Sequence, residues 1–581
     1  MSLEAIRVAN FKAFGTTQRV PLRPITLLYG ANSAGKSSVI HALALTHEAL
    51  KMGTLDVHRT GVGGDSIDLG GFAQYVHRRD RERLVTLAFE LGDVGVLPHP
   101  EDEDEHFATL PQALLEIRIG TSVQAGTKQP GEENRRRVRL ERWALEVDGA
   151  PLLSLSARRD GFMTLSQLDV THPSLLQVLA KFRALPDTAR EIRECGIDSL
   201  LGAWVTQPEI LIFPSGLRPD EWHFRSHSAL PQGGIAARHF ELARIALSDV
   251  LKALIDRITK VLTEDLGDMP YLGPLRSVPP RHPAPPSEQD PNRHSGGAYA
   301  WDILRSNRAI RQRVNDWLGD PNRLKTPYEL KVRHLLPSDL LQSELADELG
   351  PKLYELGFCL LEQAGRSEHS PELASALELV RRNADLESDA AAEAFMAVGD
   401  VVDAIFDAGV VAEEWVRKIA EAHGGDALED LVLVDKRSET LVSHRDVGVG
   451  VSQVLPVLVS AYGEDEALIA IEQPEIHLHP ALQAELGDVF LESALGGRNN
   501  RFLIETHSEH LLLRIMRRMR ETYDGGLPDG MAPVKPEDVA VLFVEPDGSQ
   551  SLVREMPLNE RGELVKAWPG GFFDEAMKEI F

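Results

Sequence analysis

The chain has 581 residues, a length that suggests three or four domains. Of these residues 43% are hydrophobic and 26% are charged, which is the composition of an ordinary folded protein. Its formal net charge of −27 argues against general coating of nucleic acid, although a local basic face could still bind it. The two cysteines, Cys195 and Cys359, lie far apart in the sequence, which excludes a disulfide framework and a thiolate metal cluster.

Neither a targeting signal nor a membrane span is expected. Residues 1–7 lack the apolar region of a signal peptide, and no uninterrupted apolar run is long enough to cross a bilayer. We therefore expect a cytoplasmic protein with no membrane partner.

A phosphate-binding loop follows the first predicted strands. Residues 2–23 predict an antiparallel pair of strands around residues 11–15, and an apolar stretch then leads into residues 30–37, which fit G-x-x-x-x-G-K-[ST]. In such a P-loop, glycines let backbone N–H groups turn toward the β-phosphate, and the helix that follows directs its N-terminal dipole at the phosphates. Lys36 is expected to reach the β- and γ-phosphates, and the Ser37 hydroxyl to bind Mg²⁺. The predicted nucleotide-binding residues of this loop are Gly30, Asn32, Ser33, Ala34, Gly35, Lys36, Ser37 and Ser38.

The remaining residues up to 170 read as a mainly β lobe. Stretches 83–91, 113–119 and 137–147 show the alternation of strands. Between them, 101–105 and 126–134 are predicted loops, the first because a run of acidic residues is most simply a solvated loop.

From residue 171 the periodicity becomes helical, and residues 171–430 are predicted to form a compact helical insert. Nine apolar residues from Leu242 to Leu262 form a wide stripe at i, i+3, i+4 spacing. Further helical stretches are expected at 301–318 and 338–423, with an irregular proline-rich connection at 279–291 and an extended piece at 328–336. No heptads are sustained, so no long coiled coil is expected.

A second part of the nucleotide site is predicted more than 400 residues after the P-loop. The apolar run 467–471 predicts a buried strand that ends in Glu472. A buried strand ending in a carboxylate is typical of a Walker B element, whose acid holds Mg²⁺ directly or through water. Glu472 and Ser37 are therefore the predicted metal ligands.

Two further segments flank this strand. A predicted hairpin over 431–443 leads into residues 446–456, which open with small residues and continue as an amphipathic helix. Downstream, the predicted strand 502–505 ends in Thr506-His507-Ser508.

In this order of elements the chain resembles the ABC-type ATPases of the SMC, RecF and OLD group. In that group, the glycine and serine signature of one subunit closes over the γ-phosphate held by the P-loop of another subunit, and a histidine after a strand senses that phosphate. The resemblance implies an α/β fold, a split ABC-type head with an antiparallel β-subdomain, whose lobes are residues 1–170 and 431–581. It implies a homodimer or higher oligomer with ATP sandwiched between heads.

The resemblance also assigns roles to single residues. His507 takes the place of the sensing histidine, and Gly448, Gly450 and Ser452 are alternatives for the contact with the partner's phosphate. Gln74, after the P-loop helix, occupies the place of the family's Q-loop, where it would orient magnesium or water; the alternative is a surface turn residue.

Other phrases point to a bacterial subgroup. Asn32 and "IEQPEIHLHP" are typical of the RecF/OLD-like branch, and 271–276, 314–318 and 568–574 look like ATPase subunits encoded in anti-phage defence clusters, as in Septu-like systems. This implies an effector partner, a nuclease or toxin, and DNA or a phage component as a further partner. The Asp-x-Asp pair of a Toprim nuclease is absent after His507, so nuclease activity is expected in a partner.

The sequence departs from the family at the water-activating position. Glu472 stands where the family has Asp, and Gln473 where it has Glu. Glutamine can orient a water but cannot accept its proton. Either Glu475 takes that role, or hydrolysis is slow and ATP binding is the main event. The signature, "VGVGVSQ", also lacks a clean serine-glycine-glycine.

Two other features have alternative explanations. Arg514, Arg517, Arg518 and Arg520 form either a strip for DNA phosphates or an acidic partner, or stems that cover apolar surface. His477 and His479 suit zinc less well than a structural turn. The rival functions are a RecF-like repair ATPase that clamps DNA and a scaffold with structural ATP.

Overall fold

The computed structural model of the chain describes residues 2–99, 102–123, 136–169, 171–180, 210–224, 235–277, 290–321, 323–335, 428–442, 447 and 449–569. The chain forms two compact units: the first comprises Met1–Pro279, Ser287–Thr326 and Arg445–Phe581, and the second Pro280–Pro286 and Pro327–His444. This division differs from the boundaries at 170 and 430 expected from the sequence. The reason is that strands at 210–224 and helices at 235–319 pack into the first unit.

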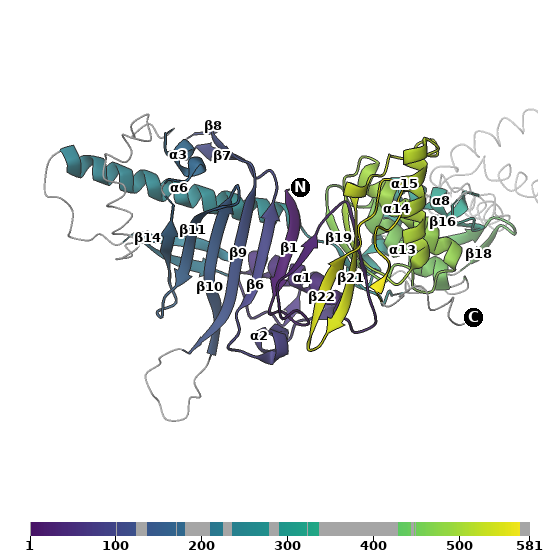
Figure 1. Cartoon of the computed structure of the whole chain (residues 1–581). Helices are drawn as coiled ribbons and strands as arrows, with labels where there is room; N and C mark the ends of the chain where they lie inside the picture. The colour runs from purple at the N-terminus through teal and green to yellow at the C-terminus, as the bar shows by residue number, and fades with distance from the viewer. Residues whose placement is uncertain are drawn as a thin grey trace, which may run out of the picture. The chain divides into compact units, whose positions relative to one another are not determined.

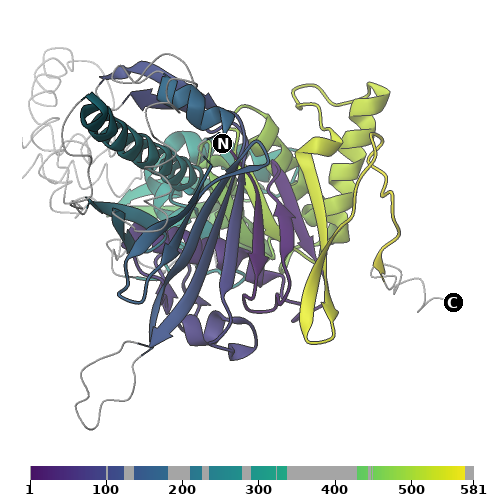
Figure 2. The ribbon, with the colours of Figure 1, turned by 60° about the vertical axis from the view of Figure 1, so that its left-hand side comes forward.

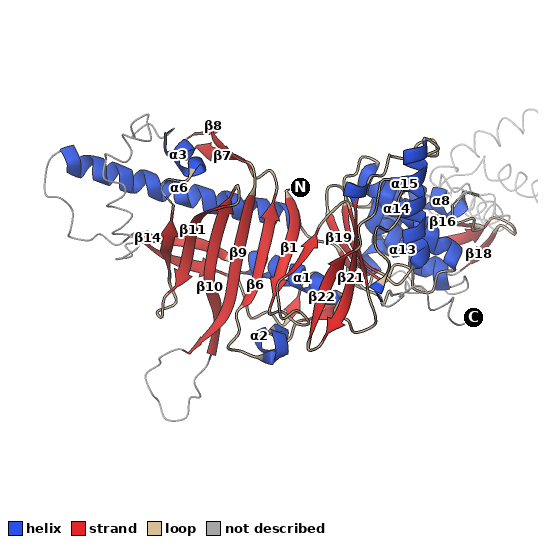
Figure 3. Cartoon of the chain, in the orientation of Figure 1, coloured by secondary structure: helices blue, strands red, loops and turns tan. Residues whose placement is uncertain are grey.

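One layer of the first unit is a nine-stranded antiparallel sheet in the order β14-β13-β12-β11-β10-β9-β6-β1-β2 (Figure 3). Its strands are β1 (Leu3–Ala9), β2 (Gln18–Pro21), β6 (Val85–Leu91), β9 (Ala113–Val123), β10 (Arg136–Val147), β11 (Ala150–Ala157), β12 (Met163–Leu168), β13 (Ile210–Ser215) and β14 (Arg218–Phe224). The predicted N-terminal strand pair and the predicted strands at 83–91, 113–119 and 137–147 are thus confirmed.

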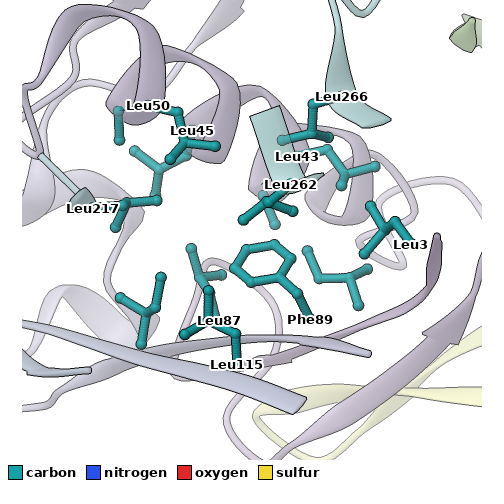
Figure 4. Close-up of a cluster of buried hydrophobic side chains, with 14 of the residues drawn as sticks. Leu3, Leu43, Leu45, Leu50, Leu87, Phe89, Leu115, Leu217, Leu262 and Leu266 are labelled. Carbon is teal, nitrogen blue, oxygen red and sulfur yellow. The ribbon is translucent and has the colours of Figure 1, made fainter. Parts of the chain in front are cut away.

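The hydrophobic core of this lobe lies between the sheet and two helices. Helix α1 (Ser37–Met52) follows the P-loop, and the long α6 (Ile235–Leu266) crosses the sheet in both Figure 1 and Figure 2. Leucines of both helices meet apolar side chains that alternate along the strands (Figure 4). The meeting side chains are Leu87, Phe89 and Leu115 of the sheet, Leu43 and Leu45 of α1, and Leu262 and Leu266 of α6.

Two local predictions are wrong in this lobe. The acidic run begins a strand, β8 (Asp102–Leu110), which pairs with β7 (Gly95–His99), so it is not a loop from residue 102 onward. Residues 210–224, expected in a helical insert, are the strands β13 and β14, because their pairing extends the antiparallel sheet beyond β12. The predicted loop at 126–134 lies outside the described residues.

The second layer is a six-stranded sheet in the order β15-β19-β20-β3-β21-β22, in which neighbouring strands are parallel except β21 and β22. Its strands are β15 (Tyr271–Leu272), β19 (Leu468–Glu472), β20 (Arg501–Glu505), β3 (Ile25–Tyr29), β21 (Val539–Asp547) and β22 (Gln550–Glu555). Every residue of β3 and β19 is buried, which explains their continuous apolar sequences. Because parallel strands end at the same edge, the segments after β3, β20 and β19 meet there.

Three helices complete this layer: α13 (Val449–Tyr462), α14 (Pro480–Leu495) and α15 (Glu509–Asp524). Helix α14 packs on β20 and β3, and α13 packs on β15 and on the helices α7 (Ala298–Ser306) and α8 (Arg308–Gly319). The sequence-predicted α/β fold with an antiparallel β-subdomain is confirmed.

The described part of the second unit is a three-stranded antiparallel sheet of β16 (Tyr328–Leu335), β17 (Leu428–Asp435) and β18 (Thr440–Val442). It confirms the predicted extended piece and hairpin. The predicted helices at 338–423 lie outside the described residues. Within the described part of the chain there is no long coiled coil, and no helix is long and apolar enough to cross a membrane.

Candidate functional site

The P-loop between β3 and α1 has a compact conformation that depends on its glycines. Gly35 has a φ of 94°, and a Cβ atom there would lie 2.4 Å from Cβ of Ala13; at Gly30, with a φ of 145°, it would lie 2.2 Å from the carbonyl oxygen of Val544. Ser33 also has a positive φ of 62°. Asn32 and Ser33 are exposed, Ser37 is half-buried, and Ala34 and Ser38 are buried. No larger residue fits at either glycine without a shift of the backbone around it.

Lys36 folds back over this loop. Its Nζ donates hydrogen bonds to the carbonyl oxygens of Gly30 and Ala31, both at 3.1 Å, and the side chain is 4% exposed. Burial lowers the pKa of Lys36, while a nearby carboxylate of Glu505 opposes that shift. The ammonium group is thus placed at the mouth of the loop where a phosphate would replace the carbonyl contacts.

Two carboxylates end neighbouring strands beside the loop. Glu472 ends β19 and Glu505 ends β20, and the two residues are partners in the register of these strands. Glu505 Oε2 accepts a hydrogen bond from Ser37 Oγ at 2.7 Å, and its Oε1 lies 3.7 Å from Lys36 Nζ. Glu472 Oε1 accepts a hydrogen bond from the Tyr271 hydroxyl at 3.2 Å. Burial, and the proximity of Glu505, raise the pKa of Glu472 to about 7.

Sequence reasoning missed Glu505. The available signal was its position, since it ends a predicted strand just before Thr506-His507-Ser508 in the way that Glu472 ends its own strand. What the sequence did not contain was the order of the strands, which places β20 between β19 and β3.

His507 lies on the loop between β20 and α15. Its Nε2 is buried, and no described residue supplies a hydrogen-bond partner for that atom. Burial lowers the pKa of His507, and the charge of Lys36 lowers it further, so the imidazole is neutral near pH 7. A buried and unsatisfied ring nitrogen beside the P-loop lysine is available to a ligand.

Glu475 anchors this histidine loop. Its Oε1 accepts a hydrogen bond from the His507 backbone N–H at 2.7 Å, and its Oε2 accepts one from the Thr506 hydroxyl at 2.8 Å. The carboxylate is 9% exposed, and burial raises its pKa. Both oxygens therefore accept hydrogen bonds from this loop, so Glu475 holds the loop in place.

Gln473 has a strained backbone that Arg276 supports. Gln473 has a φ of 46°, its N–H donates to the carbonyl of Glu505 at 2.7 Å, and its carbonyl accepts from Arg276 Nη2 at 3.0 Å. Arg276 Nη2 also donates to the carbonyl of Glu472 at 3.0 Å. From the other side, Gln453 Nε2 of α13 donates to the carbonyl of Arg276 at 3.3 Å. Arg276 thus connects the end of β19 with the signature helix, a link that the sequence did not indicate.

The three signature candidates differ in position. Gly448 lies outside the described residues. Ser452 is 2% exposed and would have to move to meet a phosphate of another chain. Gly450 is half-buried and packs against His477 and Leu478. A Cβ atom added at Gly450 would lie only 2.9 Å from the carbonyl oxygen of His477. Among the described candidates, Gly450 is therefore the one with surface to offer a partner.

Gln74 lies in the helix α2 (Phe72–Tyr75) and is exposed. It lines a cavity of about 580 Å³ together with Lys12, Asp68, Arg78 and Arg79, among others. Lys12 also approaches His41 of α1, with Nζ and Nδ1 2.6 Å apart, and burial lowers the pKa of Lys12 to about 8.

The arginines of α15 are not a free basic strip. Arg514 pairs with Glu485 at 2.8 Å and with Asp488 at 2.5 Å, and Arg518 donates from Nε and Nη2 to both oxygens of Asp488 at 2.8 Å. The side chains of these two arginines are 13% and 10% exposed. The interpretation as a strip for DNA or an acidic partner is wrong for Arg514 and Arg518, because these residues form a buried ion-pair network between α14 and α15.

The donor set fits magnesium and a nucleotide rather than zinc. His477 is exposed, His479 caps α14 by accepting from the backbone N–H of Ala481 at 3.3 Å, and no group of three or more His, Cys, Asp or Glu side chains in the described residues encloses a metal. Ser37, Glu472 and Glu505 offer hard oxygen atoms beside the P-loop. Mg²⁺ binds in this way, through one or two carboxylates, several waters and substrate phosphates.

Two family models match parts of the chain, one of them an AAA domain. Residues 281–514 match the family model described as "AAA domain, putative AbiEii toxin, Type IV TA system", and residues 534–581 match "Protein of unknown function (DUF3696)". No curated protein matches the chain.

Solved structures with similarity include heads of SMC proteins and RecF. An Smc head domain with an extended coiled coil, bound to the C-terminal domain of ScpA and derived from Pyrococcus furiosus, has 10% identity and a TM-score of 0.31, with 100% of this chain and 98% of that chain covered. The SMC head domain from Thermotoga maritima has 8% identity and a TM-score of 0.29, with coverage of 96% and 100%. The recombination mediator RecF-ATPrS has 11% identity and a TM-score of 0.25, with coverage of 95% and 98%.

Because these TM-scores are below 0.5, the assignment depends on the chain's own sheets, P-loop and carboxylates. The chain has an α/β fold with a P-loop between β3 and α1, and over residues 281–514 it is similar to the AAA-domain family named above.

Proposed function

We propose that the chain binds ATP with Mg²⁺ at its P-loop, hydrolyses ATP slowly and acts as a nucleotide-driven dimerisation switch. The observation that carries this proposal is the meeting of Lys36, Ser37, Glu472, Glu505 and the unsatisfied His507 Nε2 at one edge of the parallel sheet. When bound, Mg²⁺ would neutralise charge on the phosphates. Lys36 would bind the phosphates, and His507 would donate to the γ-phosphate.

Slow hydrolysis follows from the groups around the attacking water. Gln473 can orient this water but cannot take its proton. Glu475, the alternative base, has both oxygens engaged by Thr506 and His507. An ATPase with these groups would hold the ATP-bound state for long periods, which suits a switch.

Dimerisation is proposed because the family resemblance assigns the signature of one head to the phosphate held by another head. Within its own head, Gly450 packs against His477 and Leu478. In the proposal, the start of α13 in one head contacts the γ-phosphate held by another head. ATP then favours the closed dimer, and loss of the γ-phosphate releases it.

The proposed setting is a bacterial anti-phage defence complex in which this chain controls a separate effector, such as a nuclease or toxin, in response to DNA or a phage component. The match to a family described by a toxin and a type IV toxin–antitoxin system supports that setting. A DNA clamp of the RecF kind has less support, because Arg514 and Arg518 are used inside the head. A scaffold with structural ATP would differ by releasing no phosphate.

Cysteine crosslinking between heads tests the switch. Ser33→Cys on the exposed P-loop is combined with Val451→Cys, which is half-buried near the start of α13; Gly450 is avoided because a Cβ there would meet the His477 carbonyl. Cys195 and Cys359 are replaced by serine. We expect a crosslink between chains with Mg²⁺ and a non-hydrolysable ATP analogue, and much less without nucleotide. The matched control pairs Val451→Cys with Met52→Cys, at the far end of α1, and should not crosslink. Equal crosslinking with and without nucleotide would contradict the switch.

A further inference from the structure

We propose that Glu505 is a second carboxylate of the magnesium site, which orients the Ser37 hydroxyl and accepts hydrogen bonds from water in the coordination shell. This role rests on the proposed function, because the magnesium enters with ATP. The sequence pattern placed Glu472 alone in the carboxylate role.

The strand order brings Glu505 closer to the P-loop than Glu472. Strand β20 pairs directly with β3, with Glu505 opposite Leu28, whereas β19 pairs with β20 on its other side. Neighbouring strands lie about 4.8 Å apart. The carboxylate that contacts the loop is accordingly that of Glu505, at 2.7 Å from Ser37 Oγ. Glu472 instead accepts a hydrogen bond from Tyr271.

The direction of the Ser37 hydrogen bond is what a metal ligand requires. A serine hydroxyl has one proton and two lone pairs, and an ionised carboxylate can only accept. When Ser37 donates its proton to Glu505, both lone pairs of its oxygen are free to face a cation. Glu505 therefore fixes the ligand in the binding orientation, as partners of metal ligands commonly do.

The charge of Glu505 makes nucleotide binding depend on the metal. Glu505 is 6% exposed, so its charge is poorly screened by water. A triphosphate entering the P-loop approaches both carboxylates, and it also draws Lys36 away from its contact with Glu505 at 3.7 Å. A cation between the phosphates and Glu505 removes this repulsion.

The experiment measures metal and nucleotide affinity separately in the full chain. Mn²⁺ binding to the protein–ATP complex is followed by electron paramagnetic resonance, and ATP binding in EDTA by calorimetry. The variants are Glu505→Gln, which keeps an oxygen acceptor for Ser37, and Glu505→Asp, which keeps the charge on a shorter stem. Glu509→Gln, an exposed carboxyl at the start of α15, is the matched control.

We expect Glu505→Gln to weaken Mn²⁺ binding about 10- to 100-fold, the usual effect of losing a partner of a metal ligand. Its ATP affinity in EDTA should not fall, because the removed charge only repels the phosphates. Glu505→Asp should lose less Mn²⁺ affinity than Glu505→Gln, and Glu509→Gln should match the wild type.

Three outcomes would overturn these claims. Unchanged Mn²⁺ affinity in Glu505→Gln would sink the role of Glu505 while leaving ATP binding intact. An equal gain in the ATP affinity of Glu505→Gln with and without metal would also contradict this role, since Glu505 would then only block the empty loop. A wild type that binds no ATP under any condition would instead defeat the proposed function and this inference with it.

Discussion

Replacing Arg276 by alanine should destabilise the head and slow ATP hydrolysis together. The Arg276 guanidinium is 7% exposed and donates to the carbonyls of Glu472 and Gln473, each at 3.0 Å, and to that of Gln453 at 3.4 Å. The first two carbonyls lie at the end of β19 and just after it, and the third belongs to α13. Loss of this side chain removes its three bonds to the two elements and leaves only the bond from Gln453 Nε2 to the backbone carbonyl of residue 276.

The expected magnitude follows from the groups left without partners. A buried acceptor that loses its donor costs about 1–3 kcal/mol, so the two bonds at 3.0 Å account for about 2–6 kcal/mol, and the bond at 3.4 Å adds little. The left-handed backbone of Gln473, with a φ of 46°, stores about 1–3 kcal/mol of strain that Arg276 helps to hold. Without Arg276, Gln473 should relax, and its side chain should no longer face the attacking water consistently.

Urea unfolding and steady-state phosphate release measure the two effects. Arg276→Ala should lose about 2–6 kcal/mol in the free energy of unfolding and most of its kcat, and Arg276→Lys should fall between it and the wild type, because lysine keeps the charge but lacks the two-pronged donor geometry. The control is Arg520→Ala, an exposed residue of α15, which should change neither quantity appreciably. Wild-type stability and kcat in Arg276→Ala would refute the reasoning.

Four other substitutions test separate parts of the head. Gln473→Glu should speed hydrolysis by adding a carboxylate near the water, whereas Glu475→Ala should slow it by loosening the His507 loop; steady-state rates that neither change alters would defeat both roles. Asp488→Ala should lower the free energy of unfolding by about 3–5 kcal/mol, because it leaves Arg514 and Arg518 buried without their shared partner. A loss within about 0.5 kcal/mol, typical of a surface substitution, would show instead that these arginines are exposed to solvent. In EDTA, wild-type stability should fall as pH rises from about 4.5 to about 7, since the folded chain keeps a Glu472 proton that the unfolded chain releases; Glu472→Gln should reduce this slope, and identical slopes would contradict the raised pKa.

Local patterns were enough to predict the elements that carry the site. The P-loop, the strand ending in Glu472 and the strand before His507 are short contiguous motifs, and the structure brings all three to one sheet edge. The helical stripe at 242–262 and the alternating strands were likewise visible in single segments.

The rest depends on contacts between distant segments. Glu505 meets Ser37 only because β20 lies between β19 and β3, and no local pattern encodes that order. In the sequence, the arginines of α15 resemble a solvated strip, because their ion-pair partner Asp488 lies on a different helix, α14. Strands β13 and β14 follow a helix and owe their state to pairing at the edge of an existing sheet.

The central claim is that this P-loop binds ATP with Mg²⁺ through Lys36. Calorimetric titration of ATP into the wild type, Lys36→Ala and the control Lys51→Ala, an exposed lysine at the end of the same helix, tests it most directly. The account predicts saturable binding to the wild type and to Lys51→Ala, and no measurable binding to a folded Lys36→Ala. Equal ATP affinity in a folded Lys36→Ala would contradict it.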